Sequence, residues 1–173
     1  MSDGIVLRDV QGEESISKAI KALLNACPFK EDTDAVTFAE LSESGGISFY
    51  SLGGSVVTSE RYSVTDIVHQ RCQYNFAIVT RSFGQDGKRK MSAKDYLDNI
   101  GKWLERQTVS IETASGTQEY TLESYPMLTG GRVIESIARQ SSATLDGITD
   151  NQSDIWAINI SLVYRNEFTR VPL

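Results

Sequence analysis

The chain contains a single histidine, His69, so any serine or cysteine triad would have to use it as the general base. Cys72 follows three residues later in a segment that alternates like a strand, where two such side chains face opposite sides of the sheet. The sequence has no G-x-S-x-G nucleophile elbow. We therefore predict no catalytic residue and place His69 at the surface. A small hydrolase or transferase that uses His69 is the least favoured alternative.

Metal-binding patterns are missing from the sequence. Cys27 and Cys72 are the two cysteines, they form no CxxC pair, and one histidine cannot complete a tetrahedral zinc site. We interpret both cysteines as buried thiols without a disulfide. The acidic residues Glu31, Asp32 and Asp34 lack the glycine and the terminal glutamate of a calcium loop. We predict no metal site and interpret these residues as a solvated loop.

Glycine-rich and basic stretches could bind phosphate. Neither Gly53-Gly54-Ser55 nor Gly130-Gly131 has the spacing of a phosphate loop, so both are interpreted as turns and no cofactor is expected. The basic cluster Lys88-Arg89-Lys90, with Arg81 nearby, is interpreted as a solvated loop. Contact between this cluster and DNA or an acidic partner is the alternative.

Composition narrows the class of protein. The 173 residues carry a net charge of -6 and a sequence pI of about 4.8, which disfavours a conventional nucleic-acid binder. An acidic wall would still suit a pore through which DNA slides, because like charges keep the polyanion off the surface. No signal peptide or membrane span is recognisable, so we expect a cytoplasmic protein that does not enter a membrane.

Hydrophobic periodicity predicts the elements of the first half. Apolar residues at helical spacing predict a helix over residues 15–26, with Ser15 as its cap. Residues 35–41 and 47–52 are expected to form an antiparallel hairpin around a glycine-containing loop, and residues 53–66 to form a loop or edge. Alternating residues from Arg71 onward predict a strand with one face in the core.

The second half repeats this mixture of elements. Ser92 and Asp95 resemble a capping box, which predicts a helix to about residue 106. An inserted hairpin is expected over residues 109–122, followed by strands over 132–143 and 154–164 with a loop at 145–153. The predicted fold is α+β, a mainly antiparallel sheet packed by two helices, in the order helix, three strands, helix, inserted hairpin and two strands. We expect one domain over residues 1–173.

Five stretches in this order resemble a known family. They are Leu-Leu-Asn-Ala-Cys-Pro-Phe at 23–29, the aromatic strand 73–79, the tryptophan-containing helix 96–107, Tyr-Pro-Met-Leu at 125–128, and the strand 155–164. This arrangement is similar to that of the tail terminator family of tailed bacteriophages, also called tail completion, minor capsid or tail-to-head joining proteins. The hairpin at 109–122 departs from the shorter family pattern.

The resemblance implies a structural protein of the virion tail and neck, assembled in the host cytoplasm. It would form a homohexameric ring that stops tail-tube polymerisation. Its partners would be the tail tube protein, a neck or head-completion protein and a sheath protein where the tail has one, with DNA as passing cargo. Another virion adaptor, such as a head-completion or tail-tube-like subunit, is the alternative. The interface loops that we expect contain Ser42, Glu43, Ser44, Gly45, Gly46, Gly53, Gly54, Arg61, Lys88, Arg89, Lys90, Ser115 and Gly116.

Overall fold

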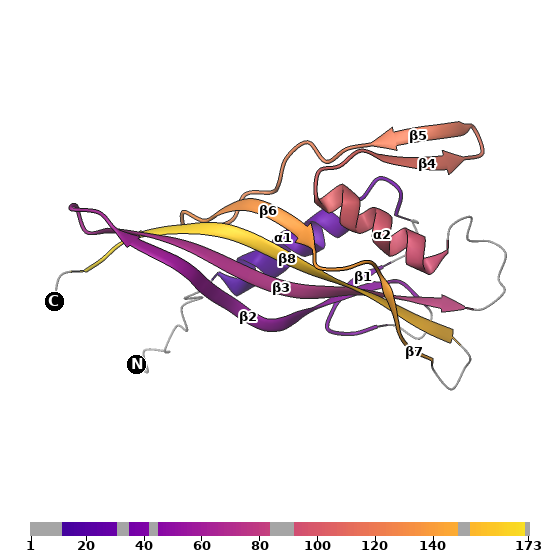
Figure 1. The fold of residues 1–173 in the computed structure, drawn as a ribbon, viewed down its shortest axis with the longest axis horizontal. Coiled ribbons are helices and arrows are strands. Elements are labelled where there is room, and N and C mark those ends of the chain that lie inside the picture. The colour runs from indigo at the N-terminus through magenta and orange to yellow at the C-terminus, as the bar shows by residue number, and fades with distance from the viewer. Residues whose placement is uncertain (1–11, 31–34, 42–44, 84–91, 149–152, 172–173) are drawn as a thin grey trace, which may run out of the picture.

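The protein has an α+β fold in which two helices pack on a mostly antiparallel sheet (Figure 1). The computed structural model describes residues 12–30, 35–41, 45–83, 92–148 and 153–171. No helix in these ranges is long and apolar enough to cross a membrane. The elements in chain order are α1 (Glu13–Asn25), β1 (Val36–Phe38), β2 (Ile47–Tyr62), β3 (Ile67–Phe83), α2 (Ala93–Leu104), β4 (Val109–Thr113), β5 (Gly116–Tyr120), β6 (Val133–Arg139), β7 (Thr144–Ile148) and β8 (Ser153–Thr169).

The main sheet is built on the antiparallel pair of β3 and β8. These two strands stay in register over all 17 residues of β3, a length of roughly 55 Å at the rise of an extended strand. β2 and β1 continue the sheet beyond β3, and β6 and β7 follow one another along the far edge of β8. β4 and β5 form a separate two-stranded sheet.

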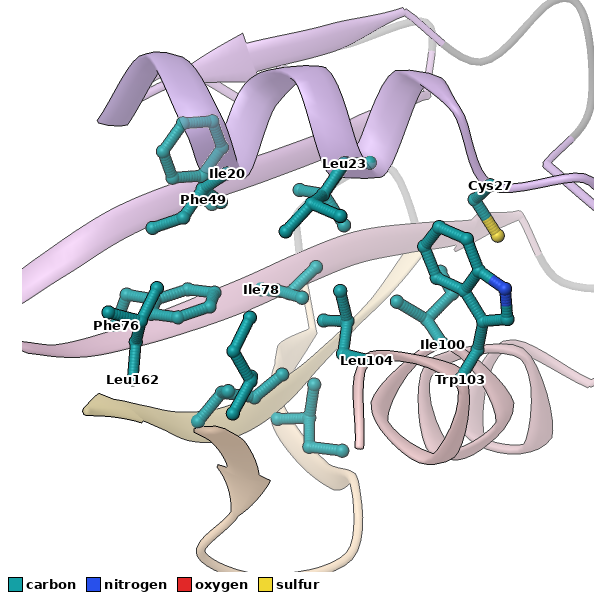
Figure 2. Packing of buried hydrophobic residues seen from close by; sticks show 14 of the residues in the cluster. Ile20, Leu23, Cys27, Phe49, Phe76, Ile78, Ile100, Trp103, Leu104 and Leu162 are labelled. Atoms are coloured by element: carbon teal, nitrogen blue, oxygen red, sulfur yellow. The ribbon is translucent and has the colours of Figure 1, made fainter. Parts of the chain in front are cut away.

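The core lies on one face of this sheet. Even-numbered residues of β3 and β8, including Phe76, Ile78 and Leu162, are buried in one cluster with residues of both helices. Figure 2 shows Ile78 between Leu23 of α1 and Leu104 of α2, and Phe76 and Leu162 together further along the sheet, below Ile20 and Phe49. The alternation predicted for both strands is therefore confirmed, because the two-residue period of a strand places every second side chain under the helices.

Helix α1 is confirmed, but its predicted cap is wrong. Gly12 occupies the N-cap position with a φ of 74°, and no side chain caps the helix. Ser15 lies inside the first turn, where its hydroxyl accepts a hydrogen bond from the backbone N–H of Thr129 at 3.0 Å. The serine thus links the helix to the segment before β6.

Helix α2 begins as its sequence predicts. The Ser92 hydroxyl accepts a hydrogen bond from the backbone N–H of Asp95 at 3.2 Å, as expected for an N-cap. Gly101 lets the helix approach the sheet closely, since an added Cβ would lie 2.4 Å from Cδ of Arg139. Glu105, after the last turn, accepts hydrogen bonds from the backbone N–H of Arg139 at 2.7 Å and from its Nε at 3.1 Å. These contacts hold the end of α2 on β6.

The antiparallel hairpin predicted for residues 35–41 and 47–52 is wrong. β1 pairs with β2 in parallel, with Val36 opposite Ile47 and Phe38 opposite Phe49. The chain turns away directly after Phe38 because Ala39 adopts a left-handed conformation with a φ of 60°. Because Ile47, the first residue of β2, lies beside Val36, the first residue of β1, the two strands run in the same direction. A tight hairpin turn would place the start of the second strand beside the end of the first.

The loop or edge predicted for residues 53–66 is confirmed in part. Residues 53–62 belong to β2 and form an edge strand, since no described strand pairs with the outer side of β2 beyond Phe49, and only Ser63 to Asp66 form a loop. Gly53 and Gly54, with φ of 109° and 77°, form an irregularity inside β2, and the strand then continues to Tyr62. Glycine is suited to such a bulge because it tolerates positive φ. The glycine pair bends the strand and does not end it.

The last part of the chain contains three strands, whereas two were predicted. Residues 132–143 do not form one strand, because Asp98 of α2 accepts a hydrogen bond from the backbone N–H of Ala143 at 2.7 Å and draws the chain toward the helix. The predicted loop at 145–153 contains β7, which pairs with the start of β8. The break at Ala143 therefore divides the edge of β8 between β6 and β7.

Asp98 should make stability depend on pH. Burial alone would raise the pKa of its carboxyl, but hydrogen bonds from Lys94 and Ala143 outweigh burial and hold the pKa below its ordinary value of 3.8. The folded state therefore favours the ionised form, and this contribution is lost as pH falls below about 3.8. We expect Asp98→Asn to lower the free energy of unfolding by about 1–2 kcal/mol at pH 7.

Urea denaturation across a pH series measures this effect. The difference between Asp98→Asn and the wild type should shrink as pH falls toward 3. Asp146→Asn, at an exposed position of β7, is the matched control and should stay within about 0.5 kcal/mol of wild type. A difference for Asp98→Asn that is constant with pH would contradict the assignment.

Candidate assembly interface

Three strands continue beyond the helices and form what we call the arm. It consists of Ser59–Tyr62 of β2, Ile67–Arg71 of β3, Arg165–Thr169 of β8 and the turn between β2 and β3. Figure 1 shows the three strands extending past α1 and past β6 toward the C-terminal end of the chain. β1 pairs only with the first three residues of β2, so no described strand pairs with the outer edge of β2 along the arm. An unpaired edge of this kind can accept another strand.

The tip of the arm is held by hydrogen bonds. The Ser63 hydroxyl accepts from the backbone N–H of Thr65 at 3.3 Å and from that of Ile67 at 3.1 Å, as in a serine-stabilised turn. The backbone N–H of Arg170 donates to the carbonyl of Asp66 at 2.8 Å, and its guanidinium lies 5.6 Å from the ring centroid of Tyr62. The arm is therefore a defined extension of the sheet.

Large apolar side chains are exposed on the arm and beside it. Val64 at the tip is completely exposed, and Tyr62 and Phe168 are 62% and 44% exposed. Isolated exposed apolar residues are ordinary, but a group of them along one extension is typical of a contact surface. The group consists of Val56, Val57, Tyr62, Val64, Phe168 and Val171.

The face of the arm that points away from the core carries a shallow hollow of about 680 Å³. Arginines dominate it: Arg71 and Arg165 lie directly opposite each other on β3 and β8, and Arg61 lies on β2. Glu135 and Glu167 are its two carboxylates, and Glu167 is 2.9 Å from Nδ1 of His69. We call this site the arginine hollow, lined by Ser59, Arg61, His69, Gln70, Arg71, Gly131, Val133, Glu135, Arg165, Asn166 and Glu167.

A bulge in β6 reduces the repulsion within the arginine hollow. Two like charges opposite each other on neighbouring strands are unfavourable. The register of β6 shifts between Ile134 and Ser136, and the residue in the shift is Glu135. Its carboxylate lies 2.9 Å from Nε of Arg71 and 3.2 Å from Nε of Arg165. One carboxylate thus bridges two guanidinium groups, which leaves the hollow with a surplus of positive charge.

The hairpin of β4 and β5 lies at the other end of the molecule (Figure 1). Phe29 packs on its base with its ring centroid 6.0 Å from that of Tyr120, and Arg106 donates to the carbonyl of Leu122 at 3.2 Å. Val109 and Ile111 are buried on its inner face, whereas Glu112 and Glu119 are exposed on the outer face. The hairpin expected over residues 109–122 therefore has an anchored base and a polar outer surface.

The expected interface residues lie in different surroundings. Ser42, Glu43, Ser44, Lys88, Arg89 and Lys90 lie outside the described residues. Gly46 is not part of an open loop: it is buried before β2, and its carbonyl accepts a hydrogen bond from the Thr80 hydroxyl at 3.0 Å. Gly45 precedes it and is half-buried. Gly53 and Gly54 lie within β2, not in a loop. Ser115 lies in the exposed turn between β4 and β5, and Gly116 is the exposed first residue of β5.

Among the expected residues that the structure describes, Arg61 alone lies in the arginine hollow. The sequence analysis missed Arg71, Arg165 and Glu135 because they are far apart in the chain and each is an ordinary polar residue in its own strand. The signal that could have found the two arginines is the alternation. It places Arg71 on the non-core side of its strand, and it would place Arg165, one residue beyond the strand predicted over 154–164, on the same side if that strand were continued.

The residues considered for catalysis are not brought together. His69 is exposed on the arm face opposite the core, whereas Cys72 is buried on the core face. Burial raises the pKa of the Cys72 thiol and raises that of Cys27 to about 12, so both thiols stay protonated and weakly nucleophilic at neutral pH. Among the described residues, no group of three or more His, Cys, Asp or Glu side chains could hold a metal ion.

The fold and the surface chemistry together define an α+β protein with an extended arm, an arginine-rich hollow on the arm and an acidic hairpin. No family model matches the chain, and no curated protein matches it.

Glu135 should stabilise the arm in a salt-dependent manner. Glu135→Ala leaves Arg71 and Arg165 facing each other, so we expect it to lower the free energy of unfolding by about 0.5–1 kcal/mol at low salt and by less at high salt. Urea denaturation at two NaCl concentrations measures this. Glu14→Ala, which breaks an exposed ion pair with Lys18 on α1, should cost a few tenths of a kcal/mol, about the value of one helix pair. A loss for Glu135→Ala that does not change with salt would show that repulsion is not its cause.

Proposed function

We propose that this chain is a structural assembly subunit of a bacteriophage tail or a phage-tail-like particle. In this proposal it forms a ring, expected to be hexameric, that terminates tail-tube polymerisation and joins the tail to the neck. No bond is made or broken in this function, because the work is done by surfaces that become complete only when subunits dock.

The observation that carries the proposal is the arm. A 17-residue strand pair continues past the helices and exposes an unpaired strand edge together with apolar side chains. An open edge and an apolar group are unfavourable in an isolated soluble subunit, since they invite pairing with other chains. They are useful in a subunit whose neighbours cover them.

The order of motifs supports the more specific part of the proposal. The resemblance to tail terminators rests on five stretches. Four lie in or overlap α1, α2, β3 and β8, and the fifth, Tyr-Pro-Met-Leu at 125–128, lies between β5 and β6. The proposed partners are other copies of the chain, the tail tube protein, a neck or head-completion protein and, in a contractile tail, the sheath protein. DNA would pass through the ring as cargo, and the protein would reside in the tail and neck of a virion assembled in the host cytoplasm.

Deleting the gene and imaging the particles tests the proposal. Loss of a terminator should give tails longer than normal, whereas loss of a tube subunit should give no tails. Tails of normal length without this protein would refute the terminator role. Particles with empty or unsealed heads and otherwise normal tails would favour the alternative, a head-completion adaptor.

The arm can be tested on the purified protein. Val64 is completely exposed, so Val64→Asp should leave the melting temperature unchanged and weaken assembly, because a charged group would be placed in an apolar contact. Negative-stain imaging of the protein, alone and with tube protein, gives the fraction in rings. Ser142→Asp, at an exposed position between β6 and β7 and away from the arm, is the charge-matched control for a general effect of acidity. Equal assembly by the wild type and Val64→Asp would exclude the tip of the arm from the contact.

His69→Ala separates the structural proposal from the enzymatic alternative. The side chain is exposed, and its ion-pair partner Glu167 is exposed as well, so the variant should fold. His69 lines the arginine hollow, but Arg61, Arg71 and Arg165 all remain in this variant, so we expect it to form rings and normal tails. A variant that assembles normally but loses function in infection would revive the alternative of a His69-dependent enzyme.

A further inference from the structure

Two surfaces of opposite charge lie at the two ends of the molecule. The arginine hollow is on the arm, and the β4–β5 hairpin projects near the end of α2 that lies away from the arm (Figure 1). The chain as a whole is acidic, with a net charge of -6, so a surplus of positive charge at one end is a local feature.

The charged residues on the outer face of the hairpin, Glu112 and Glu119, are both acidic. Between Arg106 and Arg132 the sequence contains no lysine or arginine. Ser110 lies opposite Glu119 and Glu112 lies opposite Thr117, so the two glutamates are diagonal neighbours on the exposed face of the two strands. Diagonal neighbours in an antiparallel pair are separated by about 7–8 Å between Cα atoms. Within the described ranges, neither glutamate has an ion-pair partner.

The arginine hollow presents positive charge on three neighbouring strands. Arg71 and Arg165 are directly opposite across β3 and β8, and Arg61 is on the third strand, opposite His69. Glu135 is shared by two of these arginines, and Arg61 has no ion pair with any described residue. Three guanidinium groups therefore face outward with two carboxylates among them. Carboxylates from another molecule would neutralise the remaining positive charge.

We infer that the acidic outer face of the β4–β5 hairpin of one copy docks in the arginine hollow of a neighbouring copy. The contact joins different surfaces of the two copies, which is the heterologous type of interface that generates a closed ring when the rotation permits. Arginine suits the contact because its planar fork can bind carboxylates through two parallel hydrogen bonds. The inference rests on the proposed ring function and identifies the surfaces that build the ring.

Charge favours a second copy over nucleic acid as the occupant. The arginines form one compact group, and the rest of the chain carries more negative charge than the whole. Nucleic acid held along its backbone requires neutralisation of several phosphates by a broad basic surface. Two glutamates on the protruding β4–β5 hairpin could be bound by the small surplus of positive charge in the arginine hollow.

The test uses charge reversal on each surface of the full chain. Glu112→Lys/Glu119→Lys reverses the hairpin, and Arg61→Glu/Arg71→Glu reverses the net charge of the hollow. Because Arg71→Glu places a carboxylate beside Glu135, urea denaturation checks that this variant is folded. Arg61→Glu alone, which breaks no ion pair with a described residue, is the second variant of the hollow. Each variant alone should require at least about a tenfold higher concentration for half-maximal assembly, because like charges would meet. Sedimentation velocity, with and without tube protein, measures this.

Two combinations make the test specific. An equal mixture of the two variants should assemble again, since each reversed surface meets its complement on the other variant. A chain that carries all four substitutions should also assemble alone. Added NaCl should weaken assembly of the wild type and strengthen that of either single-surface variant, because screening reduces attraction in one case and repulsion in the other. Glu14→Lys/Glu40→Lys changes the net charge equally at other exposed positions and should assemble like the wild type.

The possible failures are distinguishable. Rings formed normally by the hairpin-reversed variant, or no rescue in the mixture, would overturn this inference and leave the proposed function intact. Absence of rings from the wild type, together with tails of normal length when the gene is deleted, would overturn the proposed function itself. Binding of a short DNA duplex by the wild type that Arg61→Glu/Arg71→Glu abolishes would assign the hollow to nucleic acid and likewise overturn the inference.

Discussion

The antiparallel pairing of β3 with β8 is the constraint on which the rest of the structure depends. Because the two strands remain in register from Ile67 to Phe83, every even-numbered side chain stays on one face. Over one part of its length this face is covered by α1 and α2 and forms the core. Over the rest the same ladder continues as the arm, where the opposite face holds the arginine hollow. One register therefore sets both the packing of the core and the arrangement of the side chains in the arginine hollow.

Periodic elements could be predicted from the sequence because their burial is periodic. Both helices, the core faces of β3 and β8 and the Ser92 cap follow from local spacing. The errors occurred where tertiary contacts override local signals. Asp98 divides β6 from β7 by binding the backbone of Ala143, and the glycines of β2 were interpreted as an end when they form a bulge. Neither the contact between Asp98 and Ala143 nor the pairing of β2 with β3 across the bulge can be inferred from the residues near them in the sequence.

The candidate interface was harder to predict than the fold, and the reason is physical. Its arginines come from β2, β3 and β8, and the carboxylate that joins two of them comes from a bulge in β6. Each residue alone resembles a solvated surface charge. The register brings Arg71 directly opposite Arg165, where two like charges repel each other. The carboxylate of Glu135 contacts both guanidinium groups and reduces this repulsion. Loops were expected to make the contacts, whereas the structure offers regular strands, whose positions are fixed by backbone hydrogen bonds.

The length of the β3–β8 ladder also has a mechanical consequence. A force that pulls the two strands in opposite directions along their axes loads all the hydrogen bonds between them together, so many must break at once. A force that peels the strands apart breaks them one after another and meets less resistance. An arm built as a direct continuation of the core strands can thus carry a lengthwise load into the core without a hinge between them. A joint between two large particles would gain resistance to shear from this arrangement.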